Sequence, residues 1–213
     1  MIIDERLVTY INSLDTGNTE ILDTIEKEAL DTYVPIIRKE MQGFLKLLLA
    51  MKRPARILEV GTAVGFSAIL MAEYDPVECE ITTIENYEKR IPIARENFKR
   101  AGKEHQITLL EGDATEILKE LTKPYDFIFM DAAKGQYIHF MPDILRLLKP
   151  EGLLVSDNVL QDGDIIESHF IVTRRNRTIH KRMREYLYAL THSEGLVTTV
   201  LPIGDGVTVS VRK

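Results

Sequence analysis

Carboxylate residues recur where short apolar runs of the sequence end. Glu59, Glu85, Asp131 and Asp157 each close such a run, and Asp113 comes shortly after another. If the runs are parallel strands, their carboxyl ends share one edge of a sheet, where the ligands of open α/β sheets bind. An acidic residue can also cap the helix that follows a strand, and for Asp113 that alternative stays open. Capping is a poor account of all five positions together, so the sequence predicts one acidic cleft.

Asp131, Asp157 and Asn158 form a group with its own chemistry. They offer three hard oxygen donors on adjacent strand ends, the kind of ligand that magnesium takes while leaving positions for water and substrate. No matching histidine or cysteine accompanies them, which disfavours zinc. The alternative for Asp157-Asn158 is an ordinary turn after the strand. We therefore expect a magnesium site built by these three residues.

Lys134 follows Asp131 by three residues, in the segment DAAK. A lysine beside a divalent cation has its charged form disfavoured, so it could act as a base or orient an attacking oxygen. A solvated loop lysine is the alternative.

A glycine turn stands between a buried strand and a helix in RILEVGTAVGFSAILMA, residues 56–72. Gly61 and Gly65 let the backbone turn sharply and approach a ligand, because they lack a Cβ. Their spacing, G-x-x-x-G, is shorter than the dinucleotide fingerprint, and no Gly-Lys-Ser/Thr follows as in a phosphate loop. Glu59, just before the turn, would repel a pyrophosphate. A zwitterionic or cationic ligand, similar to an amino acid, suits the turn better.

Two further positions complete a ligand of this kind. Glu85 ends the second strand, where a carboxylate can accept both hydroxyls of a ribose. Asp113-Ala114 suits the edge of an adenine, while Glu59 and Gly61 face the charged end of the ligand.

The elements that must position these residues alternate along the chain. Three helices are expected before the sheet, followed by five strand–helix units and a closing hairpin whose turn is Gly204-Asp205-Gly206. The pattern predicts an α/β fold: a seven-stranded, mostly parallel sheet with helices on both faces, in one domain of residues 1–213 with a helical cap at 1–50 and a core at 56–213. The expected helices are 4–14, 18–32, 36–51, 65–74, 87–101, 114–121, 137–148 and 174–193, and the expected strands are 56–60, 80–85, 106–110, 125–130, 153–157, 196–202 and 206–212.

Composition narrows the class of protein. The 213 residues are 45% hydrophobic and 28% charged with a net charge of −6, which is ordinary for a soluble domain and argues against wholesale coating of nucleic acid. The single cysteine, Cys79, excludes an intramolecular disulfide and is expected to fill apolar space. No apolar run is long enough for a membrane span, and the acidic N-terminus lacks a signal peptide's features. A cytoplasmic enzyme without membrane or disulfide partner is expected.

These residues together resemble the class I S-adenosylmethionine-dependent methyltransferases, a Rossmann-like fold. Within them, the chain is similar to the cation-dependent O-methyltransferase family that includes the catechol and caffeoyl-CoA enzymes. The resemblance implies a methyltransferase with S-adenosylmethionine and Mg²⁺ as cofactors, and a homodimer. The resemblance rests on these segments: VPII at 34–37, ILEVGTAVGFSA at 57–68, TIE at 83–85, GDA at 112–114, DAAKGQY at 131–137, SDNVL at 156–160 and LPIGDGV at 201–207.

The resemblance also assigns roles by position. Lys134 and Asp131 would be catalytic, and Asp131, Asp157 and Asn158 would bind the metal. The methyl donor would be bound by Met41, Glu59, Gly61, Thr62, Gly65, Ser67, Glu85, Asp113, Ala114 and Asp131.

A basic run distinguishes this chain from members that act on small molecules. Between Thr173 and Arg184 there are six cationic residues and His180 but no acid. A solvated helix face is the alternative, yet a basic stripe in an acidic protein is typical of phosphate contacts. The six expected RNA-binding residues are Arg174, Arg175, Arg177, Lys181, Arg182 and Arg184.

With this run, DAAKGQY and the GDG hairpin are similar to the bacterial tRNA 5-hydroxyuridine methyltransferases of the family. The resemblance implies that the partner is tRNA and that 5-hydroxyuridine at the anticodon wobble position becomes 5-methoxyuridine. The vicinal oxygens of that base, like those of a catechol, can chelate one cation, and the loop position makes base extrusion less costly. The alternatives are a small-molecule catechol or caffeoyl-CoA-type O-methyltransferase and an RNA-binding module without activity.

Overall fold

The structure is a computed structural model, and it describes residues 3–168 and 170–213. A seven-stranded sheet runs through it in the order β3-β2-β1-β4-β5-β7-β6. β1 to β5 are parallel neighbours, and β7 pairs antiparallel with both β5 and β6. The strands are β1 (Arg56–Val60), β2 (Glu80–Glu85), β3 (Ile107–Glu111), β4 (Tyr125–Met130), β5 (Leu148–Ser156), β6 (Leu196–Leu201) and β7 (Val207–Arg212).

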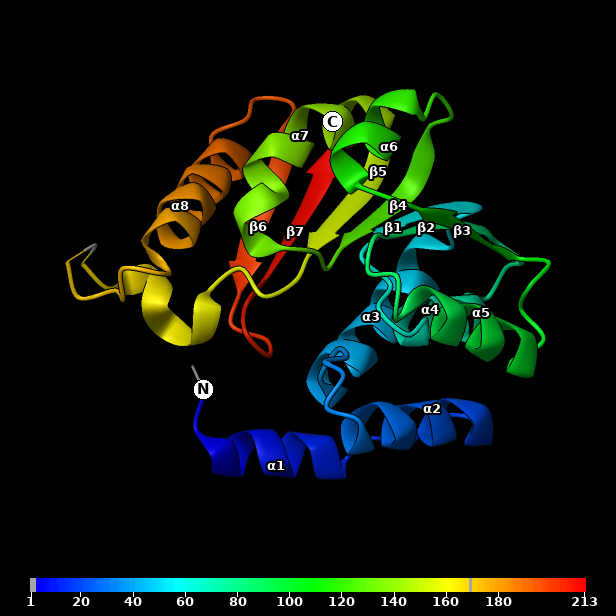
Figure 1. The fold of residues 1–213 in the computed structure, drawn as a ribbon. Coiled ribbons are helices and arrows are strands. Elements are labelled where there is room, and N and C mark those ends of the chain that lie inside the picture. Colours follow the sequence, from blue (N-terminus) through cyan, green and yellow to red (C-terminus); the bar gives the residue numbers. More distant parts are fainter. Residues whose placement is uncertain (1–2, 169) are drawn as a thin grey trace.

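Helices cover both faces of this sheet (Figure 1). α3, α4 and α5 share one apolar core with one face of the strands, and α6, α7 and α8 share a second core with the other face. Alternate residues of β1 divide between the two cores, Ile57 on one side and Leu58 on the other, as the period of a strand requires. The helices are α1 (Glu5–Ser13), α2 (Glu20–Asp31), α3 (Lys39–Lys52), α4 (Phe66–Tyr74), α5 (Ile91–Arg100), α6 (Ala114–Glu120), α7 (Tyr137–Leu147) and α8 (Arg177–Thr191), with 3₁₀ helices η1 (Lys134–Gln136) and η2 (Gln161–Ile166).

The predicted fold class is confirmed, and the seven predicted strands are present. The buried Cys79 is likewise where the sequence placed it, inside the first core. No helix of the described residues is both long and apolar enough to cross a membrane.

Several element boundaries differ from the prediction. α3 begins at Lys39 rather than at residue 36, because Ile36 and Ile37 are non-helical and Arg38 occupies the N-cap with an extended backbone. α8 begins at Arg177, after a turn at 174–176, so Arg174 and Arg175 lie outside the helix. β5 starts five residues earlier than expected and pairs irregularly with β4 at that end.

Candidate active site

A cavity of about 730 Å³ lies where the chain leaves the carboxyl ends of β1, β2, β4 and β5. Most of the predicted site residues meet there, because parallel neighbouring strands end at one edge. Of the ten residues expected to bind the donor, eight line this cavity: Met41, Gly61, Thr62, Ser67, Glu85, Asp113, Ala114 and Asp131. The other two, Glu59 and Gly65, lie behind its wall.

One end of the cavity is formed by the turn after β1 and by the end of β2; we call it the glycine-turn end. Gly61 has φ +94°, and a Cβ there would collide with the backbone carbonyl of Asp131. Gly65 has φ +88° as the N-cap of α4, and a Cβ there would overlap the ring of Phe98. Gly61 therefore allows β1 and β4 to approach, and Gly65 allows α4 to start against α5.

Glu59 is fully buried beneath this turn. Its two carboxylate oxygens accept hydrogen bonds from the hydroxyls of Ser67 and Thr83, each at 2.5 Å. Burial raises the pKa of Glu59 to about 7, although these hydroxyls act in the opposite direction. In this structure Glu59 orients Ser67, which does line the cavity.

Glu85 is nearly buried at the end of β2, and backbone amides fix its carboxylate. One oxygen accepts the N–H of Ala63 at 2.8 Å, and the other accepts those of Asn86 and Tyr87 at 3.0 and 2.8 Å.

Asp113 combines the two alternatives that its position offered, capping a helix and bordering the ligand. It accepts the N–H of Thr115 at 2.7 Å as the cap of α6, and it lines the cavity.

The opposite end contains Asp131, Asp157 and Asn158, and we call it the carboxylate end. Burial raises the pKa of Asp131 and of Asp157, and the charge of Asp131 raises the pKa of Asp157 further. The charge of Lys134 lowers the pKa of both. The buried carboxylate of Asp157 and the half-buried carboxylate of Asp131 repel each other, which favours an added positive charge between them.

The residues at the carboxylate end fit a magnesium ion. The described residues hold no group of three or more His, Cys, Asp or Glu side chains suited to a metal, so an ion here would rest on two carboxylates and the Asn158 amide. Magnesium is usually held in this way, with one or two carboxylates and several positions left to water or substrate. The donor set is all oxygen, as predicted.

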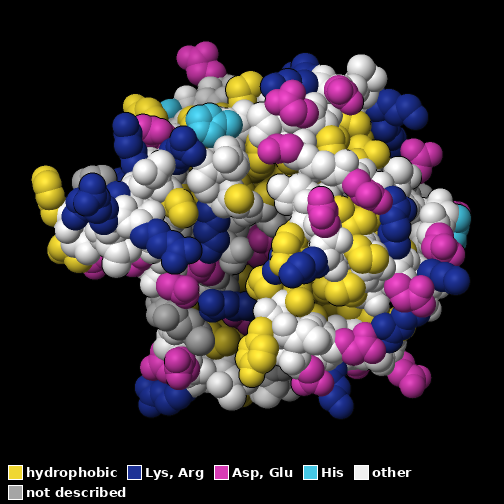
Figure 2. Space-filling model, viewed as in Figure 1, with side chains coloured by type: hydrophobic (Ala, Val, Ile, Leu, Met, Phe, Trp, Pro, Cys, Tyr) yellow, Lys and Arg dark blue, Asp and Glu magenta, His cyan; other side chains and the backbone are white. Residues whose placement is uncertain are grey.

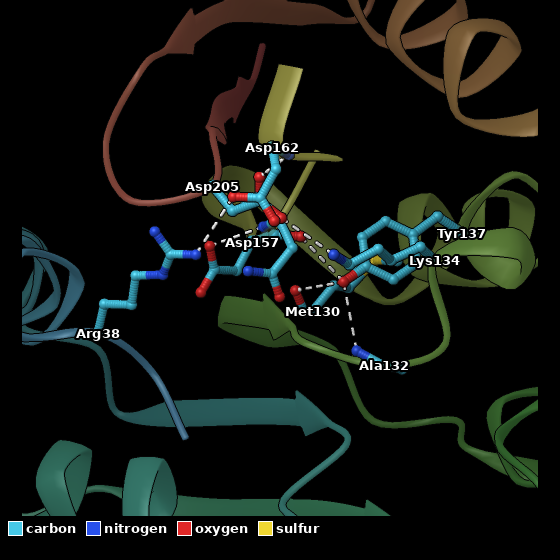
Figure 3. Close-up of polar contacts among 9 residues, drawn as sticks. Arg38, Met130, Ala132, Lys134, Tyr137, Asp157, Asp162 and Asp205 are labelled. Carbon is cyan, nitrogen blue, oxygen red and sulfur yellow. Dashed lines mark hydrogen bonds and ion pairs between the residues drawn. The ribbon is translucent and has the colours of Figure 1, made fainter. Parts of the chain in front are cut away.

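Lys134 projects toward this end and is held by a residue that the sequence did not single out (Figure 3). Its ammonium lies 3.1 Å from Oδ2 of Asp205, which is 3% exposed. The other oxygen of Asp205 accepts the backbone N–H of Asp162, whose own carboxylate lies 3.4 Å from the guanidinium of Arg38. An acid between two glycines in a hairpin was the available signal, but it indicated only a turn.

The basic run is engaged in contacts within the chain to a large extent. Arg182 donates to the carbonyl of Gly135 at 3.2 Å, beside Lys134, and Arg184 donates to that of Ile165 at 3.1 Å. Arg177 donates to the carbonyls of two residues in the segment before α8. Lys181 lies 3.8 Å from Glu185, just beyond the acid-free stretch.

Arg174 and Arg175 are exposed. Figure 2 shows lysine and arginine side chains gathered over α8 and the segment before it, next to the hollow at the centre of that face.

Comparisons with known proteins agree with the fold. The profile of the family described as O-methyltransferase matches residues 12–213. A catechol O-methyltransferase from Niastella koreensis is 37% identical over 173 residues, which cover 78% of this chain and 78% of that protein. The structure of a candidate caffeoyl-CoA O-methyltransferase from Staphylococcus aureus has a TM-score of 0.90 at 32% identity and covers 99% of this chain and 100% of its own. The methyltransferase PaMTH1 of Podospora anserina, solved with S-adenosylhomocysteine bound, has a TM-score of 0.87 at 27% identity and covers 98% and 94%.

Fold and site together define an S-adenosylmethionine-dependent methyltransferase with a Rossmann-like fold. The family match is more specific: this chain belongs to the O-methyltransferase family. The resemblance to that family is thereby confirmed, whereas a particular closeness to the tRNA enzymes stays a prediction.

Proposed function

We propose that the protein transfers a methyl group from S-adenosylmethionine to one of two adjacent hydroxyls of a small aromatic substrate, with Mg²⁺ as cofactor. One observation carries the proposal: the mutually repelling carboxylates of Asp131 and Asp157 line the same cavity as Lys134 and the glycine turn. The name of the Niastella koreensis relative, a catechol O-methyltransferase, supports this substrate class.

The glycine-turn end suits the donor. Glu85, fixed by three backbone amides, is placed to accept the ribose hydroxyls, and Asp113 and Ala114 border the space for the adenine. Gly61 leaves room for the amino-acid part of the donor next to the hydroxyls of Thr62 and Ser67. The Thr62 hydroxyl is buried and acts with Ser67 and Thr83 to lower the pKa of Glu59, so the polar groups of this end are held in place by the chain. Met41 closes this end from α3.

At the carboxylate end, Asp131, Asp157 and Asn158 would hold the cation. A bound Mg²⁺ supplies positive charge that makes a hydroxyl easier to ionise near neutral pH. Lys134, steered by Asp205, would orient the acceptor hydroxyl or receive its proton. The chain's main contribution is alignment, since the donor already carries a reactive methyl group.

A second candidate substrate is 5-hydroxyuridine in tRNA, which has vicinal oxygens of the same kind. The observation that favours it is the exposure of Arg174 and Arg175 beside Phe170 and Ile171, whose side chains are 84% and 70% exposed. Such a mixture of cations and an aromatic ring suits single-stranded RNA. It is the weaker candidate, because Arg177, Arg182 and Arg184 donate to carbonyls of their own chain.

The expected homodimer is also a proposal. α1 has no buried residue and exposes Leu7, Tyr10 and Ile11, and its C-cap residue Leu14 is exposed as well; a second copy would cover this apolar face. Sedimentation of the protein at two concentrations tests it: a monomer at both overturns the dimer.

An assay with two substrates in separate reactions tests which one is methylated. The protein is given labelled S-adenosylmethionine, with Mg²⁺ or with EDTA, and either catechol or an anticodon stem-loop containing 5-hydroxyuridine. We expect label in catechol only when Mg²⁺ is present. Label in the stem-loop and none in catechol overturns the first candidate in favour of the second, and transfer at full rate in EDTA overturns the role of the cation.

A further inference from the structure

Tyr137 begins α7 and is completely buried, yet it is polar at its tip. Its hydroxyl lies 3.1 Å from the carbonyl oxygen of Met130 and 3.1 Å from that of Asp157, and it accepts the N–H of Ala132 at 3.3 Å. A phenol has one hydrogen to donate, so the two carbonyls share it or alternate. Figure 3 shows these contacts converging on one oxygen atom.

All three of these backbone groups belong to the carboxylate end. Met130 and Ala132 are the residues on either side of Asp131, and the remaining carbonyl is that of Asp157 itself. The same Met130 carbonyl also accepts the N–H of Asp157 at 2.9 Å. The Tyr137 hydroxyl therefore ties the end of β4 to the end of β5 at the two points where the acidic side chains leave the backbone.

The two acids need such a restraint. Their charges repel each other, and the regular pairing of β4 with β5 ends just before them, at Met130 and Ser156. Beyond that point each acid keeps a single backbone N–H bond to the neighbouring strand. Magnesium demands nearly ideal octahedral geometry, so a change in the separation of its protein ligands weakens binding. Groups that hold ligands in place without touching the metal typically contribute tenfold to a hundredfold to affinity.

We propose that Tyr137 is a positioning residue that sets the separation of Asp131 and Asp157 through its hydroxyl, and thereby the affinity of the site for a divalent cation. The inference rests on the proposed function, because it requires that this site binds a cation. Tyr137 is the last residue of the motif DAAKGQY, and in this proposal it acts on the backbone of the metal ligands and does not touch the substrate.

Tyr186 provides a matched control. It is also fully buried, its ring packs edge-on against Tyr137 at 5.4 Å, and its hydroxyl is paired with Oγ of Ser156 at 2.7 Å. Phenylalanine at either position removes one buried hydroxyl from the same core. Only the hydroxyl of Tyr137 bonds to the backbone next to Asp131.

The experiment compares wild type, Tyr137→Phe and Tyr186→Phe. Titration calorimetry measures the affinity of each protein for Mn²⁺ without donor, and activity against Mg²⁺ concentration gives the half-saturating concentration and the saturated rate. For Tyr137→Phe we expect about tenfold weaker Mn²⁺ binding and about tenfold more Mg²⁺ for half-saturation, with a smaller change in the saturated rate. Tyr186→Phe should bind Mn²⁺ as the wild type does, with a comparable loss in melting temperature.

Four outcomes would count against the proposal. Equal Mn²⁺ affinity in wild type and Tyr137→Phe overturns the inference alone, as does an equal loss in both variants, which would show a general effect on the core. A wild type that binds neither cation overturns the proposed cation dependence and the inference with it. Affinity for S-adenosylhomocysteine, measured in the same samples, should be unchanged in Tyr137→Phe; a matching loss there would also overturn a role confined to the carboxylate end.

Discussion

The two ends of the cavity treat buried acids in different ways. At the glycine-turn end, Glu85 accepts three backbone amides and Glu59 accepts two hydroxyls, so the chain itself satisfies these carboxylates. At the carboxylate end, Asp157 is as deeply buried and Asp131 is half-buried, but the two repel each other, and the charge of Lys134 lowers the pKa of both. The first end is complete before any ligand binds, whereas the second favours a cation from outside.

The largest effect on activity is expected from the loss of one negative charge at the carboxylate end. Asp157→Asn removes a carboxylate from the carboxylate end, and we expect the methylation rate to fall about a thousandfold, because a metal contributes several kcal/mol to such reactions. Initial rates with catechol at saturating donor measure it. The melting temperature should not fall, since a repulsion has been removed. A variant that keeps its rate would contradict the assignment of this end.

The pH dependence of stability tests the buried acid at the other end. The pKa of Glu59 is about 7 in the folded protein and about 4.5 unfolded, so its contribution to stability is fully present below pH 4.5 and is lost as the pH rises through 7. Between pH 4.5 and 8, the unfolding free energy of wild type should therefore fall by up to about 3 kcal/mol relative to Glu59→Gln. Urea unfolding of both proteins across this range measures the difference. Parallel pH profiles would show that Glu59 does not titrate in this way.

Glu85→Gln should weaken donor binding without changing the carboxylate end. The amide places an NH₂ group against backbone donors, and the ribose loses a charged acceptor, which is typically worth about 1.5–3 kcal/mol. We expect the dissociation constant for S-adenosylhomocysteine to rise about tenfold to a hundredfold by calorimetry. Mn²⁺ affinity should be unchanged. A matching loss of Mn²⁺ affinity would mean that the two ends are not independent.

The smallest effect on activity is expected from disturbing the orientation of Lys134. Asp205→Asn removes the charge that faces its ammonium, and we expect kcat to fall about tenfold while the KM for the donor is unchanged, because the lysine loses its orientation. Asp162→Asn is the matched control: its carboxylate pairs with Arg38 at 3.4 Å, both side chains are exposed, and exposed pairs of this kind contribute little. Equal losses in both variants would indicate a disturbed loop rather than a misplaced lysine.

Much of the site was predictable because parallel strands end at one edge. Five acids after five apolar runs were enough to expect one cleft, and Glu85, Asp113, Asp131 and Asp157 do line it. Glu59 has the same position at the end of its strand, but its side chain faces α4 instead of the cavity, and the sequence pattern does not distinguish these cases. The basic run was predicted as one RNA-binding face, whereas Arg182 and Arg184 donate to the loops beside the site.

What the sequence by itself determined is the order of strands and helices, the glycine turn and the set of acids at the strand ends, since these follow from local patterns of apolar residues and turn residues. Only the tertiary structure decided that Asp205 faces Lys134 and that the Tyr137 hydroxyl joins β4 to β5. Asp205 and Lys134 are 71 residues apart in the chain, and Tyr137 and Asp157 are 20 apart. Contacts of this kind depend on how the hairpin and α7 pack against the sheet, which no local pattern records.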